Sequence, residues 1–173
     1  MLIEKITKER LECFYKNCKY LENLKKDLEG FKSNYNFLKA SGDFSNTRVT
    51  SGNKKWSEEE QYVNMIQRKS KEYEILKRRL ENEKFIIETQ IKRLTNPTYQ
   101  KILTRRYLML EDWRNITFEL YGGKDDWTVW GHTKYELLTM NLHRRARDKL
   151  LEISQTPFLP ETEQKTIKDL IND

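Results

Sequence analysis

Residues that interrupt helices are scarce in this 173-residue chain, which contains three prolines and six glycines. Hydrophobic residues make up 36% of it and charged residues 35%, a low apolar share for one compact globule. No window approaches the roughly 18 uninterrupted apolar residues of a membrane-spanning helix, and the charged residues 1–10 lack a signal-peptide core. These absences predict an extended, helical, cytoplasmic protein without a membrane segment.

Metal-binding and catalytic groups are also scarce. Cys13 and Cys18 are five residues apart on an expected helix, so their side chains point about 140° apart and cannot share a metal. His132 and His143 have no cysteine nearby, which favours structural histidines. The Gly-Gly-Lys segment at 122–124 lacks the spacing and the Ser or Thr of a phosphate-binding loop. We therefore expect no metal, no cofactor and no enzymatic activity.

Positive charge, by contrast, is in excess. Lysine and arginine number 33 against 27 aspartate and glutamate residues, which gives a net charge of +6. This balance favours a polyanionic partner.

The first half of the chain carries two apolar stripes with the spacing of a coiled coil. One comprises Leu11, Phe14, Cys18, Leu21, Leu24, Leu28, Phe31, Tyr35 and Leu38. The other comprises Tyr62, Ile66, Tyr73, Leu76, Leu80, Ile87, Ile91 and Leu94, and is interrupted by Lys69 and Glu83. A turn-rich segment, 40–57, separates them, and Ser57 is the expected N-cap of the second helix.

Residues 1–94 are therefore predicted to form an antiparallel helical hairpin with a flexible loop at 40–57, because sequence-adjacent helices usually pack together. The same stripes are compatible with pairing between two chains. We favour the hairpin, with a homodimer as an addition to it.

Residues 95–153 are predicted to form three shorter helices. Thr95-Asn96-Pro97 breaks the second long helix, and Asp112 caps a helix whose expected apolar face is Trp113, Ile116, Phe118 and Leu120. After an aromatic turn at 121–132, Thr133 and Glu136 match a capping box. The helix that follows has an expected apolar stripe of Tyr135, Leu138, Leu142, Ala146, Leu150 and Ile153.

Three helices of this size form a helix-turn-helix unit, with Trp127 and Trp130 expected in its core. The tail, 154–173, contains Pro157 and Pro160 and is expected to hold at most one short helix.

The order of these features resembles a family of phage and prophage transcriptional regulators. The resemblance covers residues 10–153 and rests on Leu94-x-x-Pro97, Leu103-x-x-Arg106-Tyr107, Trp113-x-x-Ile116 and Leu142-His143-x-x-Ala146-x-x-x-Leu150. Such proteins join an N-terminal coiled coil to a C-terminal half like region 4 of bacterial sigma factors. The resemblance implies a positioning helix at 113–116, a recognition helix around 142–146, and action on double-stranded DNA in a bacterial host cell. Here the 121–132 turn is longer than in the family, and Thr117 stands where alanine is common.

The candidate DNA-binding residues are Lys101, Arg105, Arg106, Arg114, Lys134, Asn141, Arg144 and Arg145. Lys134 and Asn141 are candidate base readers, because lysine donates to guanine and asparagine pairs with adenine. Charge runs are also typical of solvated helix faces, so a rival hypothesis remains. In it the chain is a protein-interaction module without DNA binding, such as an anti-repressor or assembly factor. A variant of the DNA-binding hypothesis is sigma-like action on RNA polymerase, and RNA polymerase or a phage or host regulatory protein is an expected partner beside DNA.

Overall fold

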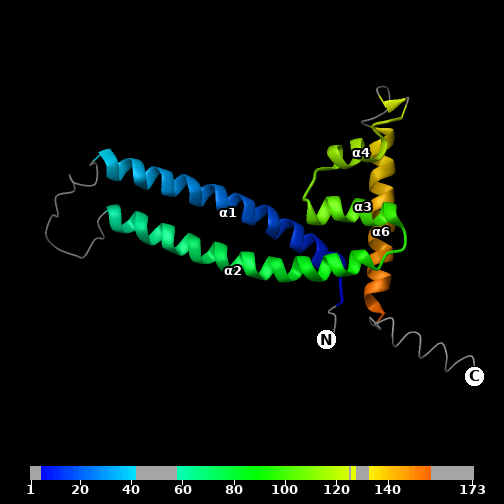
Figure 1. The fold of residues 1–173 in the computed structure, drawn as a ribbon, viewed down its shortest axis with the longest axis horizontal. Helices are drawn as coiled ribbons and strands as arrows, with labels where there is room; N and C mark the ends of the chain where they lie inside the picture. Colours follow the sequence, from blue (N-terminus) through cyan, green and yellow to red (C-terminus); the bar gives the residue numbers. More distant parts are fainter. Residues whose placement is uncertain (1–4, 42–57, 125, 128–132, 157–173) are drawn as a thin grey trace, which may run out of the picture. The chain divides into compact units, whose positions relative to one another are not determined.

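The computed structural model describes residues 5–41, 58–124, 126–127 and 133–156. These ranges form the helices α1 (Lys8–Ser41), α2 (Glu58–Lys92), α3 (Pro97–Leu103), the π-helical turn η2 (Thr104–Leu108), α4 (Trp113–Tyr121) and α6 (Lys134–Gln155) (Figure 1). The described ranges contain no strand, so the expected all-α class is confirmed. Among the described residues, no helix has the length and apolar character needed to cross a membrane.

The chain divides into two compact units. Unit 1 combines Met1–Phe14 with Glu83–Asp173, and unit 2 is Tyr15–Asn82. Each unit therefore contains part of α1 and part of α2. The boundary predicted after residue 94 falls inside unit 1.

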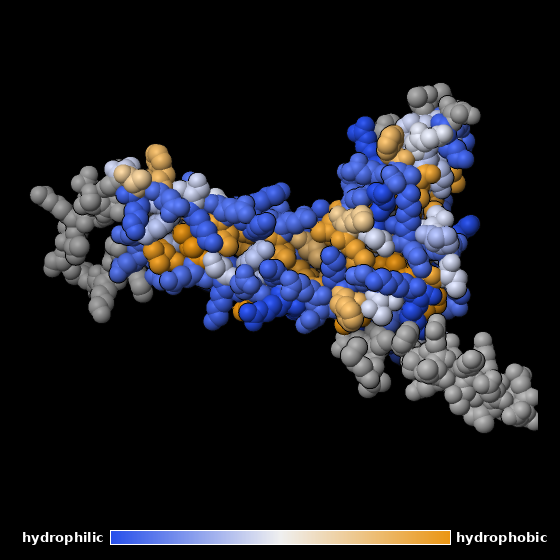
Figure 2. Space-filling view, viewed as in Figure 1, coloured by the Kyte–Doolittle hydropathy of each residue, from blue (hydrophilic) through white to orange (hydrophobic). Residues whose placement is uncertain are grey.

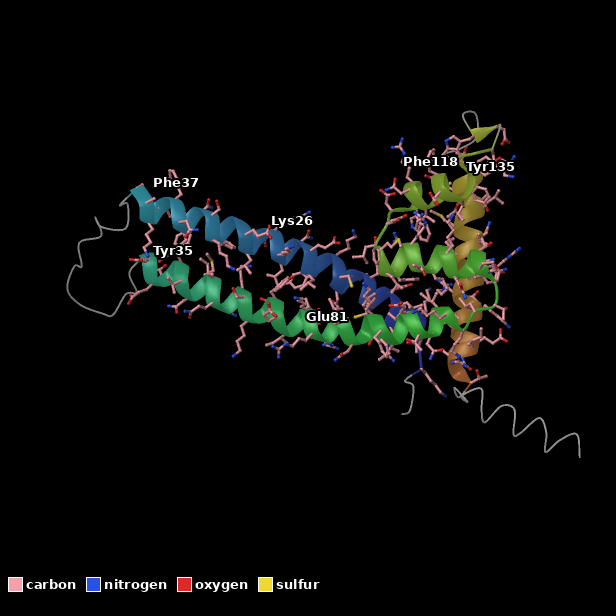
Figure 3. All side chains as sticks on the ribbon, in the orientation of Figure 1. Lys26, Tyr35, Phe37, Glu81, Phe118 and Tyr135 are labelled. Carbon is pink, nitrogen blue, oxygen red and sulfur yellow. The ribbon has the colours of Figure 1, made fainter. Side chains whose placement is uncertain are left out.

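In unit 2, α1 and α2 pack against each other in antiparallel directions. The Tyr20 hydroxyl donates to Glu72 Oε1 at 2.7 Å, and the Tyr35 hydroxyl donates to Glu59 Oε1 at 3.0 Å. The later residue of α1, Tyr35, contacts the earlier residue of α2, Glu59. The two helices therefore run in opposite directions and form a hairpin. Hydrophobic residues gather between the two helices in Figure 2, and Tyr35 points toward α2 whereas Phe37 points away from it in Figure 3.

The two charged residues that interrupt the second apolar stripe both find partners on α1. In unit 2 the Lys69 ammonium lies 5.5 Å from the centre of the Phe31 ring, a cation-π distance. In unit 1 the Glu83 carboxylate accepts two hydrogen bonds from Arg10, with Arg10 Nη2 at 2.9 Å from Glu83 Oε2. A bidentate arginine–carboxylate pair requires one relative position of its helices, so within unit 1 this pair fixes how the start of α1 lies against α2.

Two predicted helix starts in unit 1 are confirmed by their capping bonds. Asn96 Oδ1 accepts from the backbone N–H of Thr98 at 2.9 Å, and Pro97 occupies the first helical position, where its missing N–H costs nothing. Asp112 Oδ1 accepts from the backbone N–H of Asn115 at 2.8 Å. The capping box predicted at Thr133 is wrong, because the Thr133 side chain makes no capping bond.

The apolar stripe predicted for α6 is wrong in part. The buried residues of α6 are Tyr135, Thr139, His143, Ala146, Leu150 and Ser154. Leu138 is exposed, and Leu142 and Ile153 are half-buried. The helix is thus rotated so that three polar residues replace three predicted apolar ones. In α4 the change is similar, since Thr117 is buried and Phe118 is exposed.

The C-terminal end of α6 is anchored to other parts of unit 1. The Ser154 hydroxyl donates to the carbonyl of Ile6 at 3.2 Å, and Arg93 Nη2 donates to the Thr156 hydroxyl at 3.1 Å. These bonds tie α6 to the segment before α1 and to the residues after α2. Ser57, Trp130, His132 and the tail beyond residue 156 lie outside the described residues.

Candidate nucleic-acid interface

The surface of α6 opposite its buried residues is basic in its N-terminal half. The exposed side chains that share this surface, here called the outer face of α6, are Lys134, Leu137, Leu138, Asn141, Arg144 and Arg145. Their spacing of three and four residues places them on one side of the helix. Helices α3 and α4 pack against the other side of α6, and within the described part of unit 1 neither helix covers this face (Figure 1).

The rotation of α6 depends on His143. Its Nε2 lies 3.2 Å from the Tyr107 hydroxyl of η2, and its ring meets the Trp113 ring of α4 edge-on at 4.8 Å between centroids. The Arg106 guanidinium stacks on the Trp113 ring, 4.4 Å from the centre of that ring. The imidazole is therefore held by η2 and by α4 at the same time.

Burial keeps His143 uncharged at neutral pH. Desolvation, together with the positive charges of Arg147 and Arg106, lowers its pKa from 6.5 to about 4, against a smaller opposing effect of Asp148. Burial also raises the pKa of the Tyr107 hydroxyl. The neutral imidazole of His143 and the neutral hydroxyl of Tyr107 form one hydrogen bond with each other. Neither group therefore adds an unpaired charge to the core.

Two further buried polar residues, one in α6 and one in α4, form hydrogen bonds within their own helices. The Thr139 hydroxyl donates to the Tyr135 carbonyl at 2.8 Å, and the Thr117 hydroxyl donates to the Trp113 carbonyl at 2.7 Å. Each bond runs back one helical turn, so a threonine methyl is presented to the core without an orphaned hydroxyl. Thr117, which differs from the alanine of the resembled family, is accommodated in this way.

Three of the predicted DNA-binding cations instead join α3, η2 and α4 to one another. Arg105 Nη1 donates to both carboxylate oxygens of Glu111, at 3.0 and 2.9 Å, and Arg105 Nη2 lies 2.9 Å from Glu119. Lys101 Nζ lies 3.0 Å from the same Glu119 carboxylate, and the Lys101 hydrogen bond and the Arg105 charge lower the pKa of Glu119. Arg106, besides stacking on Trp113, donates to the Glu111 carbonyl at 3.0 Å.

Lys134 is also engaged within the protein. Its ammonium lies 3.0 Å from Asp126 Oδ2, and Asp126 accepts a further hydrogen bond from the buried Tyr135 hydroxyl. These hydrogen bonds, from Tyr135 first and then from Lys134, lower the pKa of Asp126, and Asp126 raises the pKa of Lys134. The pair fixes the chain before α6 to the first turn of that helix.

The structure thus separates the predicted site residues into two groups. Asn141, Arg144 and Arg145 share the outer face of α6, and Arg114 is exposed in the first turn of α4. Within the described part of the chain, no ion pair is formed by Arg114, Arg144 or Arg145. Lys101, Arg105, Arg106 and Lys134 are engaged in the contacts given above.

Two apolar residues of the outer face were missed in the sequence analysis. Leu137 and Leu138 have 62% and 43% of their surfaces exposed, between Lys134 and Asn141. The sequence contains a second series with a helical spacing, at positions 135, 139, 143, 146, 150 and 154. If that series is buried, Leu137 and Leu138 are on the exposed side of the helix. Choosing between the two series requires knowing which polar residues find partners, and sequence spacing alone does not supply that.

Comparisons with protein-family models, with curated proteins and with solved structures give no match to this chain. Among the described residues, no group of His, Cys, Asp and Glu side chains is arranged to hold a metal ion. The functional argument therefore rests on the geometry of the outer face of α6.

The buried His143 predicts a specific dependence of stability on pH. Since its pKa is about 4 in the folded state and 6.5 ordinarily, the unfolded chain binds a proton first as the pH falls. The contribution of His143 to the free energy of unfolding should be constant above about pH 6.5, decline between pH 6.5 and 4 by about 3 kcal/mol, and level off below.

Urea unfolding followed by circular dichroism at several pH values measures this contribution, when the wild type is compared with His143→Gln. Carboxylates titrate in both proteins, so their effects cancel in the difference. The difference between the two stabilities should shrink as the pH falls through this window. Parallel stability curves from pH 7 to 4 would show that His143 is not buried in its neutral form.

Proposed function

We propose that the protein binds double-stranded DNA through the outer face of α6 and acts as a transcription regulator. The observation that carries the proposal is that Arg144, Arg145 and Asn141 are exposed together on the side of α6 opposite the one on which α3 and α4 pack. From Lys134 to Arg145 the face extends about 16 Å along the helix, and a helix about 10–12 Å in diameter fits a major groove about 12 Å wide.

The residues of this face have side chains suited to different parts of DNA. Arg144 and Arg145 carry the charge that neutralises phosphates, and Asn141 has the donor and acceptor pair that matches adenine. Leu137 and Leu138 suit the methyl group of thymine, which is the one apolar group exposed in the major groove. In this proposal Arg114, which is exposed in the first turn of α4, contacts the phosphate backbone, as residues of positioning helices do.

The exposed leucines also favour a second function. Leu137, Leu138 and Met140 are apolar and exposed on the same helix, and clustered exposed apolar residues are typical of protein interfaces. Under this alternative α6 docks on a protein, and arginines at its rim set the orientation. Measurement of DNA binding separates the two functions, because only the first requires salt-sensitive retention of a duplex.

Phosphate contacts by Arg144 and Arg145 predict a change in the salt dependence of binding. Replacing both residues by alanine should weaken binding to all duplexes and flatten the slope of log affinity against log salt by about two units, because two fewer counterions are released. Fluorescence anisotropy with a labelled duplex at several salt concentrations measures the slope. Lys149→Ala is the matched control, since that lysine pairs with Glu152 at 2.8 Å further along α6. An unchanged slope in the double variant, or an equal change in the control, would contradict the assignment.

If residues of the outer face contact bases, replacing them should reduce discrimination between base pairs and change the slope of log affinity against log salt only slightly. A duplex selected by the wild type from a randomised pool should contain adenine–thymine pairs, because Asn141, Leu137 and Leu138 match adenine and thymine. Asn141→Ala should relax discrimination at one position by about 1 to 3 kcal/mol. Replacing thymine by deoxyuridine, which removes only the methyl group, should weaken the wild type and leave a Leu137→Ala, Leu138→Ala variant unaffected. If methyl removal affects both proteins equally, the leucines do not contact bases.

A further inference from the structure

The hairpin surface in unit 2 carries a hollow that DNA binding by α6 does not use. It encloses about 500 Å³, and its apolar floor is formed by Tyr20 of α1 with Ile75 and Leu76 of α2. Ile75 is 61% exposed, although it is a large apolar residue in the middle of a long helix. The Tyr20 hydroxyl donates to Glu72, so its polar group already has a partner within the protein.

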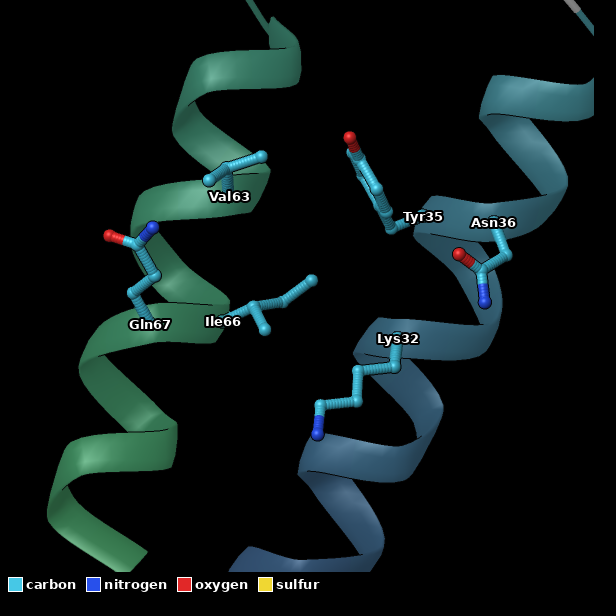
Figure 4. Close-up of a pocket in the computed structure, with 6 residues that line it drawn as sticks. All are labelled: Lys32, Tyr35, Asn36, Val63, Ile66 and Gln67. Carbon is cyan, nitrogen blue, oxygen red and sulfur yellow. The ribbon is translucent and has the colours of Figure 1, made fainter.

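The hollow continues along α2. A second hollow of about 520 Å³ shares Arg68 with the first and extends to Gln61. From Gln61 to Arg79 the two hollows span about 27 Å of helix, the length of about five helical turns. We call the combined depression the basic trough. By contrast, the hollow in Figure 4 is smaller, at about 310 Å³, and Tyr35 and Ile66 point into it from the two helices.

The charge of the basic trough indicates the chemistry of its occupant. Arg68, Lys71 and Arg79 line it, and Glu72 is its single carboxylate. Glu72 already accepts the hydrogen bond of Tyr20. Within the described part of the chain, Arg68, Lys71 and Arg79 form no ion pair. An apolar floor flanked by three cations is complementary to an apolar surface flanked by carboxylates.

We infer that the basic trough binds an acidic amphipathic helix of a partner protein, which lies along α2 as a third helix beside the hairpin. Such a helix presents apolar residues at a spacing of three and four to Ile75 and Leu76, and glutamate or aspartate on both flanks to the cations. Its association is stabilised by burial of the exposed isoleucine, and the charges select its orientation and its identity.

Two other occupants fit less well. A second copy of this chain in a two-fold dimer would place the same patch on itself, so the arginines and lysine of one copy would face those of the other. A nucleic acid would meet the charges, but its phosphates would gain nothing from Ile75, Leu76 and the Tyr20 ring. The acidic helix is the occupant that uses both the apolar floor and the cations.

The probe is a fluorescein-labelled 18-residue helical peptide with leucines along one face and glutamates on both flanks. Its twin carries lysine in place of every glutamate. Anisotropy with the full-length wild type should show binding of the acidic peptide that weakens with added salt, and no binding of the basic twin. Ile75→Ser should weaken binding by about tenfold or more. Phe85→Ser is the matched control, because Phe85 is equally exposed, at 63%, on the same helix but outside the trough, and it should leave binding unchanged.

A charge exchange keeps the test independent of any effect on folding. The triple variant Arg68→Glu, Lys71→Glu, Arg79→Glu should lose the acidic peptide and gain the basic twin. Equal binding of both peptides to the wild type, or equal weakening by Ile75→Ser and Phe85→Ser, would overturn the inference. Two further results would overturn it. In the first, the wild type sediments as a dimer that Ile75→Ser dissociates, and neither peptide binds. In the second, the triple variant loses DNA binding, and the acidic peptide binds neither the wild type nor the variant. These measurements need no DNA target, so their outcome is separate from that of the proposed function.

Discussion

The neutral imidazole of His143, held between Tyr107 and Trp113, is the contact on which the rest of the C-terminal helices depends. Because Tyr107 belongs to η2 and Trp113 to α4, one side chain sets how α6 lies on both segments. In a helix with 3.6 residues per turn, turning position 143 inward also turns Thr139 inward and positions 141 and 145 outward. The composition of the exposed face of α6 is thus a consequence of what is buried behind it.

Some arginines and lysines of unit 1 form ion pairs within the protein, and others do not. Arg105 and Lys101 meet Glu111 and Glu119, and so brace α3 and η2 against α4. These are partly exposed pairs, whose individual contributions to stability are small but whose shared carboxylates restrict the relative positions of the segments. Arg144 and Arg145 take no part in this bracing and remain available to a ligand. The basic residues of unit 1 therefore include cations that are paired within the protein and cations that are exposed on α6.

Local rules predicted much of this fold. The spacing of Leu24, Leu28 and Leu80, the breaks at Asn96 and the cap at Asp112 depend on neighbouring residues and on simple burial, so sequence reasoning identified the helices and their starts. The rotation of α6 depends on partners far away in the sequence. Leucine is ordinarily preferred in a core over histidine and threonine, and only the Tyr107 hydroxyl and the Trp113 ring reverse that preference at His143. The ion pair of Lys134 with Asp126 likewise depends on a partner that helix spacing does not reveal.

The rotation of α6 is tested most directly by the chemical accessibility of two adjacent positions. In a Cys13→Ser, Cys18→Ser background, Leu138→Cys and Thr139→Cys each introduce one thiol whose rate of reaction with a maleimide reports its exposure. Leu138 is exposed and Thr139 is fully buried, so the thiol at position 138 should react at least about tenfold faster than the thiol at position 139. The reverse order, with position 138 protected and position 139 reactive, would place the leucine series in the core and contradict the outer face described for α6.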